Sequence, residues 1–190
     1  MPIFAGSVLH GGPNTLGFLM GATGVGALVS TFLLAARKSV LGLGRVIPVA
    51  SILFGTGLIA FGASTYLWLS LLCVLLAGAG MMQQMAASNT VLQTIVDDDK
   101  RGRVMSFYSM AFMGMAPIGS LIAGFAASHI GAPHTLMIGG VLCILGGGWF
   151  VLYLPSIRKE IRPIYVRLGI LPETSKAIQT VSALLTPPEE

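Results

Sequence analysis

Four amide side chains follow an apolar run and are the best candidates for hydrogen bonding to a small polar molecule. Gln83 and Gln84 come directly after Met82, and Asn89 and Gln93 follow one turn apart from each other. Amides in hydrocarbon are costly unless they meet a partner or a watery cavity. For Gln83 and Gln84, a solute pathway and hydrogen bonds between helices are both open. For Asn89 and Gln93, the structural interpretation is favoured.

A charged run over 97–103 holds three carboxylates and three cations. Its acidic residues suit the positive end of a helix dipole, so they are expected to help begin the next helix. Asp97, Arg101 and Arg103 are candidates for a latch that pairs with charges elsewhere. Exposed ion pairs contribute only about 0–1 kcal/mol each, so a latch needs several. The simpler alternative is that the cations only set the orientation in a membrane.

Pro117 lies between Gly114 and Gly119. Proline removes a backbone hydrogen bond and tends to kink a helix, so a kink is predicted at Pro117 and Gly119. A stripe of small residues surrounds it at a spacing of four, formed by Ala116, Ser120, Gly124 and Ser128. This pattern is typical of a helix that packs closely against a neighbour.

The elements that carry these residues must lie in a membrane. The chain is 54% hydrophobic and only 9% charged, whereas soluble domains carry about 25% charged residues. The sequence shows no nucleotide-binding loop, catalytic pair or metal-ligand spacing. We therefore expect no enzyme activity, no cofactor, no metal site and no nucleic-acid partner.

The charges fall into three groups, separated by uncharged stretches at 1–36, 46–96 and 104–157. A bilayer core needs roughly 20 helical residues, so the second and third stretches are each long enough for two spans. The prediction is an all-α integral membrane bundle over 1–156, with five spans at about 14–36, 46–63, 67–95, 104–128 and 134–154. The tail at 157–190 is expected to be cytoplasmic, and either an interfacial helix or disordered.

This arrangement puts all 11 Lys and Arg residues on one side of the membrane. Cytoplasmic loops are enriched in these residues. The expected topology is multi-pass in the cytoplasmic (inner) membrane of a bacterium, with the N-terminus outside and the C-terminus inside.

Two short elements carry a family resemblance. Residues 88–93 read Ser-Asn-Thr-Val-Leu-Gln, and residues 101–106 read Arg-Gly-Arg-Val-Met-Ser, ahead of Ala-Pro-Ile-Gly-Ser at 116–120. They resemble the major facilitator superfamily, in the branch of bacterial exporters that includes the enterobactin exporter. The resemblance implies that the spans are helices eight to twelve of a C-terminal bundle. It implies efflux of a small organic solute, siderophore or drug-like, by alternating access. It also implies that the first, third and fourth spans line the cavity, while the plainer second and fifth face lipid.

The chain departs from that family in two ways. Residues 35–45 stand where the family repeats a cytoplasmic gating motif, but they lack its acidic residue. Alternating access also needs two bundles around a central site, so the chain is expected to be incomplete without an N-terminal half. The alternative is a small non-transporting membrane protein that associates with itself or with another partner through its small-residue stripes.

Overall fold

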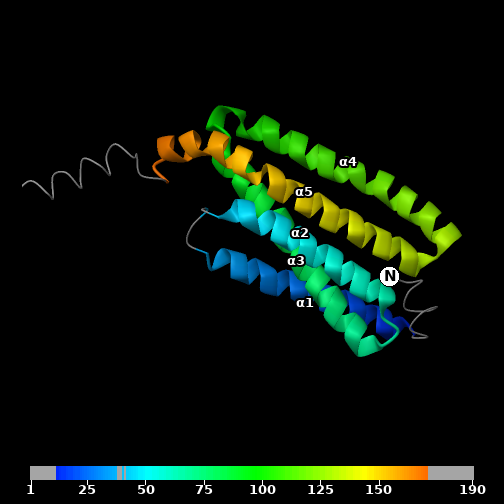
Figure 1. Cartoon of the computed structure of the whole chain (residues 1–190). Coiled ribbons are helices and arrows are strands. Elements are labelled where there is room, and N and C mark those ends of the chain that lie inside the picture. The colour runs from blue at the N-terminus through cyan, green and yellow to red at the C-terminus, as the bar shows by residue number, and fades with distance from the viewer. Residues whose placement is uncertain (1–11, 38–39, 41, 171–190) are drawn as a thin grey trace, which may run out of the picture. The chain divides into compact units, whose positions relative to one another are not determined.

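The computed structural model describes residues 12–37, 40 and 42–170 (Figure 1). Over these residues the chain forms five helices, each long and apolar enough to cross a membrane. This confirms the predicted all-α membrane class. The helices are α1 (Pro13–Ala35), α2 (Leu43–Ala63), α3 (Leu67–Ile95), α4 (Asp98–Ile130) and α5 (Ala132–Arg167).

Two helices extend beyond the spans expected from the uncharged stretches. The charged run is already helical, because α4 begins at Asp98 rather than near 104. Likewise α5 continues to Arg167 through Pro155 and Pro163. Charged residues can remain helical outside the hydrocarbon, so hydropathy marks the span and not the helix end. Of the tail predicted at 157–190, the part from 171 onwards lies outside the described residues.

The chain divides into two compact units, Met1–Leu152 and Tyr153–Glu190. The described part of the second unit continues α5 and ends in a turn. The arrangement that follows concerns the first unit.

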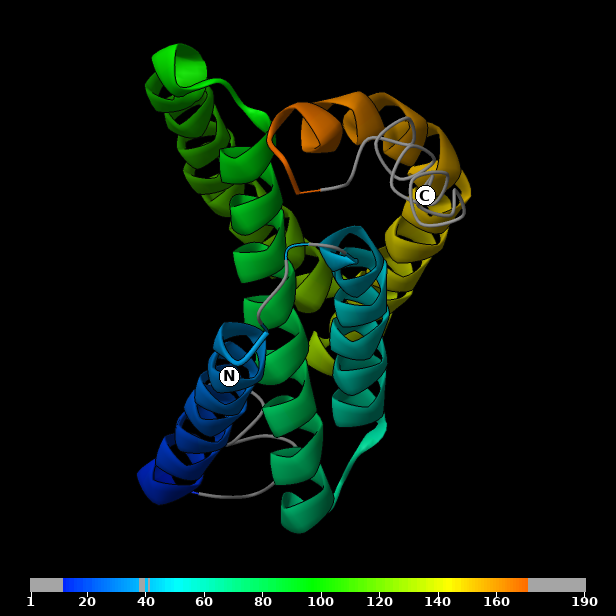
Figure 2. The same cartoon turned by 90° about the vertical axis from the view of Figure 1, so that its left-hand side faces the viewer.

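α3 is the central helix of this unit, and it contacts both α1 and α2 (Figure 2). Glycines allow the backbones to come close. A Cβ on Gly78 would collide with the Thr23 backbone of α1, and a Cβ on Gly80 would lie 2.7 Å from the Ala50 carbonyl oxygen of α2. Lipid gives no hydrophobic drive for helix association, so such close packing is the main source of cohesion.

α2 is also packed tightly against the first part of α5. A Cβ on Gly55 would lie 2.5 Å from the carbonyl oxygen of Gly140, and the reverse pair has the same distance. The Ser51 hydroxyl donates a hydrogen bond of 3.1 Å to the Cys143 carbonyl oxygen. α2 is therefore enclosed on two sides, and it is less open to lipid than its plain sequence predicts.

Candidate functional site

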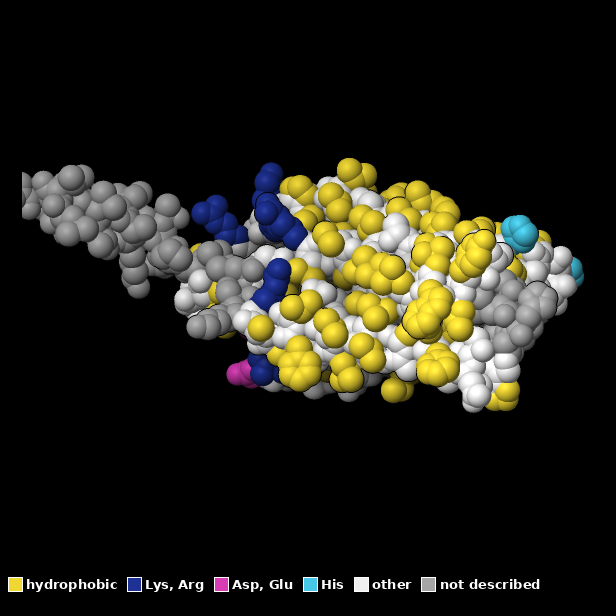
Figure 3. Space-filling view, turned by 90° about the horizontal axis from the view of Figure 1, so that it is seen from below, with side chains coloured by type: hydrophobic (Ala, Val, Ile, Leu, Met, Phe, Trp, Pro, Cys, Tyr) yellow, Lys and Arg dark blue, Asp and Glu magenta, His cyan; other side chains and the backbone are white. Residues whose placement is uncertain are grey.

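On the face of the first unit seen in Figure 3, Lys and Arg side chains lie at one end, the histidines lie at the other end, and apolar side chains fill the space between. Gln83 lies on α3 where it meets α1, and its Oε1 accepts a hydrogen bond of 3.0 Å from the Ser30 hydroxyl. Ser30 is only 1% exposed. The interhelical interpretation of Gln83 thus has a defined partner, whereas its role in a solute pathway stays a prediction. Gln84 is half-buried.

Asn89 and Gln93 lie together near the end of α3. The Gln93 side-chain amide donates a hydrogen bond of 3.1 Å to Asn89 Oδ1, and the pair is exposed. The backbone carbonyl of Gln93 accepts another bond of 3.1 Å, from Arg101 Nε. The structure therefore brings two predicted site residues together with one predicted latch residue.

The latch residues form a local corner between α3 and α4. Arg101 pairs with Asp98 at 2.6 Å, three residues away on the same helix. Asp97 is the N-cap residue of α4, and its carbonyl accepts a bond from the Lys100 amide. Arg103 is exposed. Sequence reasoning missed Asp98 as the ion-pair partner, although its spacing from Arg101 is a favourable one on a helix. Pairing with a distant group stays a prediction.

The helix-kink residues Pro117 and Gly119 lie within the unbroken α4. α4, which is described in full, has no buried residue. A Cβ on Gly114, Gly119 or Gly124 would meet nothing within 4 Å. All four residues of the small-residue stripe are exposed, and the kink stays a prediction.

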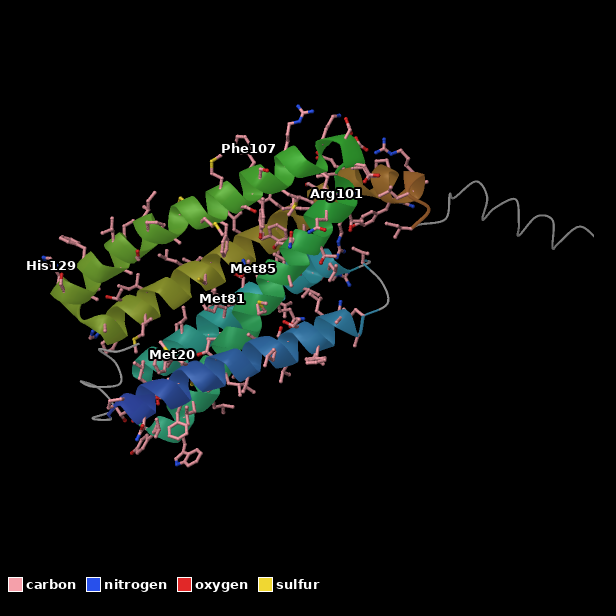
Figure 4. The ribbon with its side chains drawn as sticks, turned by 180° about the vertical axis from the view of Figure 1, so that it is seen from behind. Met20, Met81, Met85, Arg101, Phe107 and His129 are labelled. Atoms are coloured by element: carbon pink, nitrogen blue, oxygen red, sulfur yellow. The ribbon has the colours of Figure 1, made fainter. Side chains whose placement is uncertain are left out.

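A methionine groove, which sequence reasoning missed, lies between α1 and α3 (Figure 4). Its volume is about 340 Å³. The Thr23 hydroxyl in its wall donates within α1 to the Leu19 carbonyl, 2.8 Å away, so it is already satisfied. The groove is therefore an apolar surface. It is lined by Met20, Thr23, Gly24, Ala27, Gly78, Met81, Met82 and Met85.

The groove leads into the amide pair along α3. Met81, Met85, Asn89 and Gln93 are spaced by four, so each is the surface neighbour of the next in a row that winds slowly around the helix. Thioethers are flexible and polarisable, so they adapt to apolar ligands of different shape. The stripe passes from methionine to amide and then to Arg101. The spacing by four was the sequence signal for this row. It was not distinctive, because methionine is also common in ordinary membrane-spanning helices.

Comparison with known proteins gives matches over most of the chain. The profile of the transmembrane secretion effector family matches residues 1–162. An uncharacterized MFS-type transporter of Bacillus subtilis, YvqJ, is 27% identical over 158 residues, covering 83% of this chain and 37% of that protein. The staphyloferrin A transporter of Staphylococcus aureus is 26% identical over 153 residues, covering 80% of this chain and 38% of that protein.

The chain thus spans less than two fifths of the length of these relatives, at 37% and 38%. No solved structure matches.

Proposed function

The chain belongs to the transmembrane secretion effector family of the major facilitator superfamily, and we propose that it is the C-terminal portion of an exporter of small organic solutes. Within that family we place it in the branch that resembles the enterobactin exporter, with α1 to α5 as helices eight to twelve. One relative is a staphyloferrin A transporter. A siderophore or drug-like solute is the substrate class we assign.

The observation that carries this proposal is the graded stripe on α3. The groove offers an apolar contact at Met81 and Met85, and the next positions of the same i,i+4 row offer amide groups at Asn89 and Gln93. An amphipathic solute would place its apolar part on the thioethers and its polar groups on the amides. Each hydrogen bond to an amide is worth a net of about 0.5–1.5 kcal/mol, which suits a solute that must also be released.

A second helical bundle is part of this proposal. The methionine groove is open on one side, and α4 has no buried residue along its length. Alternating access places the solute between two bundles that rock around it. We assign the uncovered face of α1, α3 and α4 to contact with that bundle. The end that carries Arg37, Arg45 and Arg101 is placed in the cytoplasm, in the inner membrane of a bacterium.

The test compares the 190-residue chain alone with the chain joined to the N-terminal half of a relative such as the staphyloferrin A transporter. Both are expressed in bacteria that lack their own siderophore exporters, and efflux of siderophore is measured. The joined protein is expected to export and the chain alone is not. Export by the chain alone would show that a second bundle is not needed.

The contribution of the α3 stripe is tested in the joined protein. Replacing Met85 and Asn89 together by Ala should lower efflux about tenfold, through loss of one apolar contact and one hydrogen bond. A matched control replaces Leu145 by Ala, since that side chain is 62% exposed on α5, the helix expected to face lipid, and lies outside the groove. Equal losses in both variants would remove the stripe from the pathway.

A second candidate function rests on the uncovered α4. Its small-residue stripe, exposed at Ala116, Ser120, Gly124 and Ser128, would suit a non-transporting protein that associates with itself. Size measurement of the detergent-solubilised chain separates the two. Two results together support the second function. The chain alone forms a discrete homo-oligomer through α4, and the joined protein shows no transport.

A further inference from the structure

A second pocket lies at the Lys and Arg end of the bundle, on the side of α3 that faces α2. Its volume is about 380 Å³. Arg37, from the end of α1, and Arg45, from the first turn of α2, line it together with Gln83 of α3. Both arginines are exposed. Their two positive charges therefore border one cavity.

No carboxylate lines this pocket among the described residues. The described ion pair at this end, between Arg101 and Asp98, belongs to the corner between α3 and α4. Two guanidinium groups around one cavity repel each other, and a bound anion would relieve that repulsion. Guanidinium groups match the geometry of phosphate oxygens and can bind them in a bidentate manner.

The other wall of the pocket is apolar. It is formed by Val46, Val49 and Leu53 of α2. Arg45, Val49 and Leu53 are spaced by four, so they lie on one face of the helix. At a rise of 1.5 Å per residue, Val49 and Leu53 lie about 6 and 12 Å further along the helix than Arg45. Val49 is 63% exposed, so this wall opens to the surroundings of the helix.

We propose that this pocket binds an anionic membrane lipid, with its phosphate between Arg37 and Arg45 and an acyl chain along Val49 and Leu53. A lipid phosphate lies at the interface, level with charged helix ends, while its chains run down the apolar part of the helix. Basic pockets between membrane helices are known to bind anionic head groups in this way.

A soluble anion would use the arginines but not the apolar wall. The absence of a lining carboxylate favours an anionic head group over a zwitterionic one, whose ammonium group would have no partner. The site depends on insertion in a membrane and not on solute transport.

The test measures lipid binding to the purified full chain in detergent, by native mass spectrometry with phosphatidylglycerol and phosphatidylethanolamine as probes. The wild type is expected to prefer phosphatidylglycerol. Replacing Arg37 and Arg45 together by Gln should weaken phosphatidylglycerol binding about tenfold or more, since each cation near a membrane surface contributes roughly fivefold. Replacing both by Lys should lose less affinity than replacing both by Gln, because the ammonium groups keep the charge but not the bidentate geometry.

The matched control replaces Arg158 and Arg162 by Gln, because these exposed arginines also lie on a helix but do not line the pocket. It removes the same charge and should change binding less than twofold. Equal losses in the two double variants would overturn the proposal, because they would reveal only a general charge effect. Equal binding of the two lipids by the wild type would overturn it as well.

The apolar wall is tested separately, so that a lipid is distinguished from a soluble phosphate. Glycerol 3-phosphate, added as a competitor to the wild-type chain, should displace phosphatidylglycerol only weakly. Val49→Ser should weaken the binding of phosphatidylglycerol and leave the binding of glycerol 3-phosphate unchanged. If glycerol 3-phosphate displaced phosphatidylglycerol when both were at the same concentration, the site would bind a free anion and the lipid proposal would be overturned. The competition needs no variant, so it holds even if a substituted chain is unstable.

Discussion

α2 and α4 are two long helices of one unit with opposite surroundings. Within an apolar stretch of 18 residues, 39% of α2 is buried and 0% of α4. Both contain several glycines. Those of α2 touch other backbones, as at Gly55 and Gly57, whereas those of α4 face open space. The same residue type therefore marks a completed contact in one helix and an unused surface in the other.

Lipid explains why both helices are compatible with one membrane protein. The large apolar side chains of α4 are widely exposed, with Phe107 at 73%, Met113 at 74% and Leu121 at 75%. In water this surface would drive aggregation, but in hydrocarbon it costs little. What α4 lacks, in the described part of the chain, is a fully buried residue. The chain thus combines a packed part, made of α1, α2, α3 and the start of α5, with a helix that has a surface left for another neighbour.

The largest effect should come from filling a closed glycine. Gly55→Leu places a side chain where the Gly140 carbonyl oxygen lies 2.5 Å from a Cβ, so it forces α2 and α5 apart. Overpacking typically costs about 1–3 kcal/mol, and the upper end is expected here because the obstructing atom belongs to the backbone. The measurement is unfolding of the detergent-solubilised chain in a denaturant series.

Gly124→Leu on α4 is the matched control, because a Cβ there meets nothing within 4 Å. We expect a change in unfolding free energy within about 0.5 kcal/mol, or a slight gain from helix propensity. If both variants unfolded equally easily, the contrast between the helices would be lost.

The second largest effect is expected for α4 itself, once a second bundle is present to pack against it. In the protein joined to an N-terminal half, Gly124→Leu should lower efflux about tenfold, because it blocks a close approach to α4 that glycine allows. Expression level and helix content serve as controls. Unchanged efflux would mean that α4 faces lipid at this position.

Much of the fold could be predicted from the positions of the charges. Each uncharged stretch had to be short enough for one span or long enough for two, so the number of helices followed. The positions where the helices begin and end could not be predicted from the charges. α4 begins at Asp98 because Asp98 and Arg101 can pair within a helix outside the membrane, a feature that hydropathy does not detect.

The packing of α2 was harder to predict because glycine leaves no side chain to read. A sequence with little polarity was expected to face lipid, yet Gly55, Gly57 and Gly80 bring α2 into close backbone contact with its neighbours. For the candidate site, Gln83 and Gln84 could be predicted because they are amides within an apolar helix. The methionines beside them did not, since a thioether is not distinguished from other apolar side chains until a groove is seen.

A third and smaller effect concerns hydroxyl groups on the two helices. Ser51→Ala removes the bond from α2 to the Cys143 carbonyl of α5 and should cost about 0.6–1.5 kcal/mol. Ser120→Ala on α4 removes only a bond to the nearby Pro117 carbonyl and should cost close to nothing. Chemical denaturation of both variants gives the difference. A larger loss for Ser120 than for Ser51 would contradict the assignment of α4 as unpacked.

The smallest effect belongs to the corner that leads into α4. Arg101→Gln removes the pair with Asp98 and the bond to the Gln93 carbonyl, both of which are exposed. The expected loss of stability is about 0.5 kcal/mol in low salt and less in high salt, since exposed pairs are weak and screened. Hydrogen exchange should speed up at the start of α4 while the amides of α2 keep their protection. Faster exchange in α2 as well would show that the corner supports the whole packed part, and that α4 is less independent than its burial indicates.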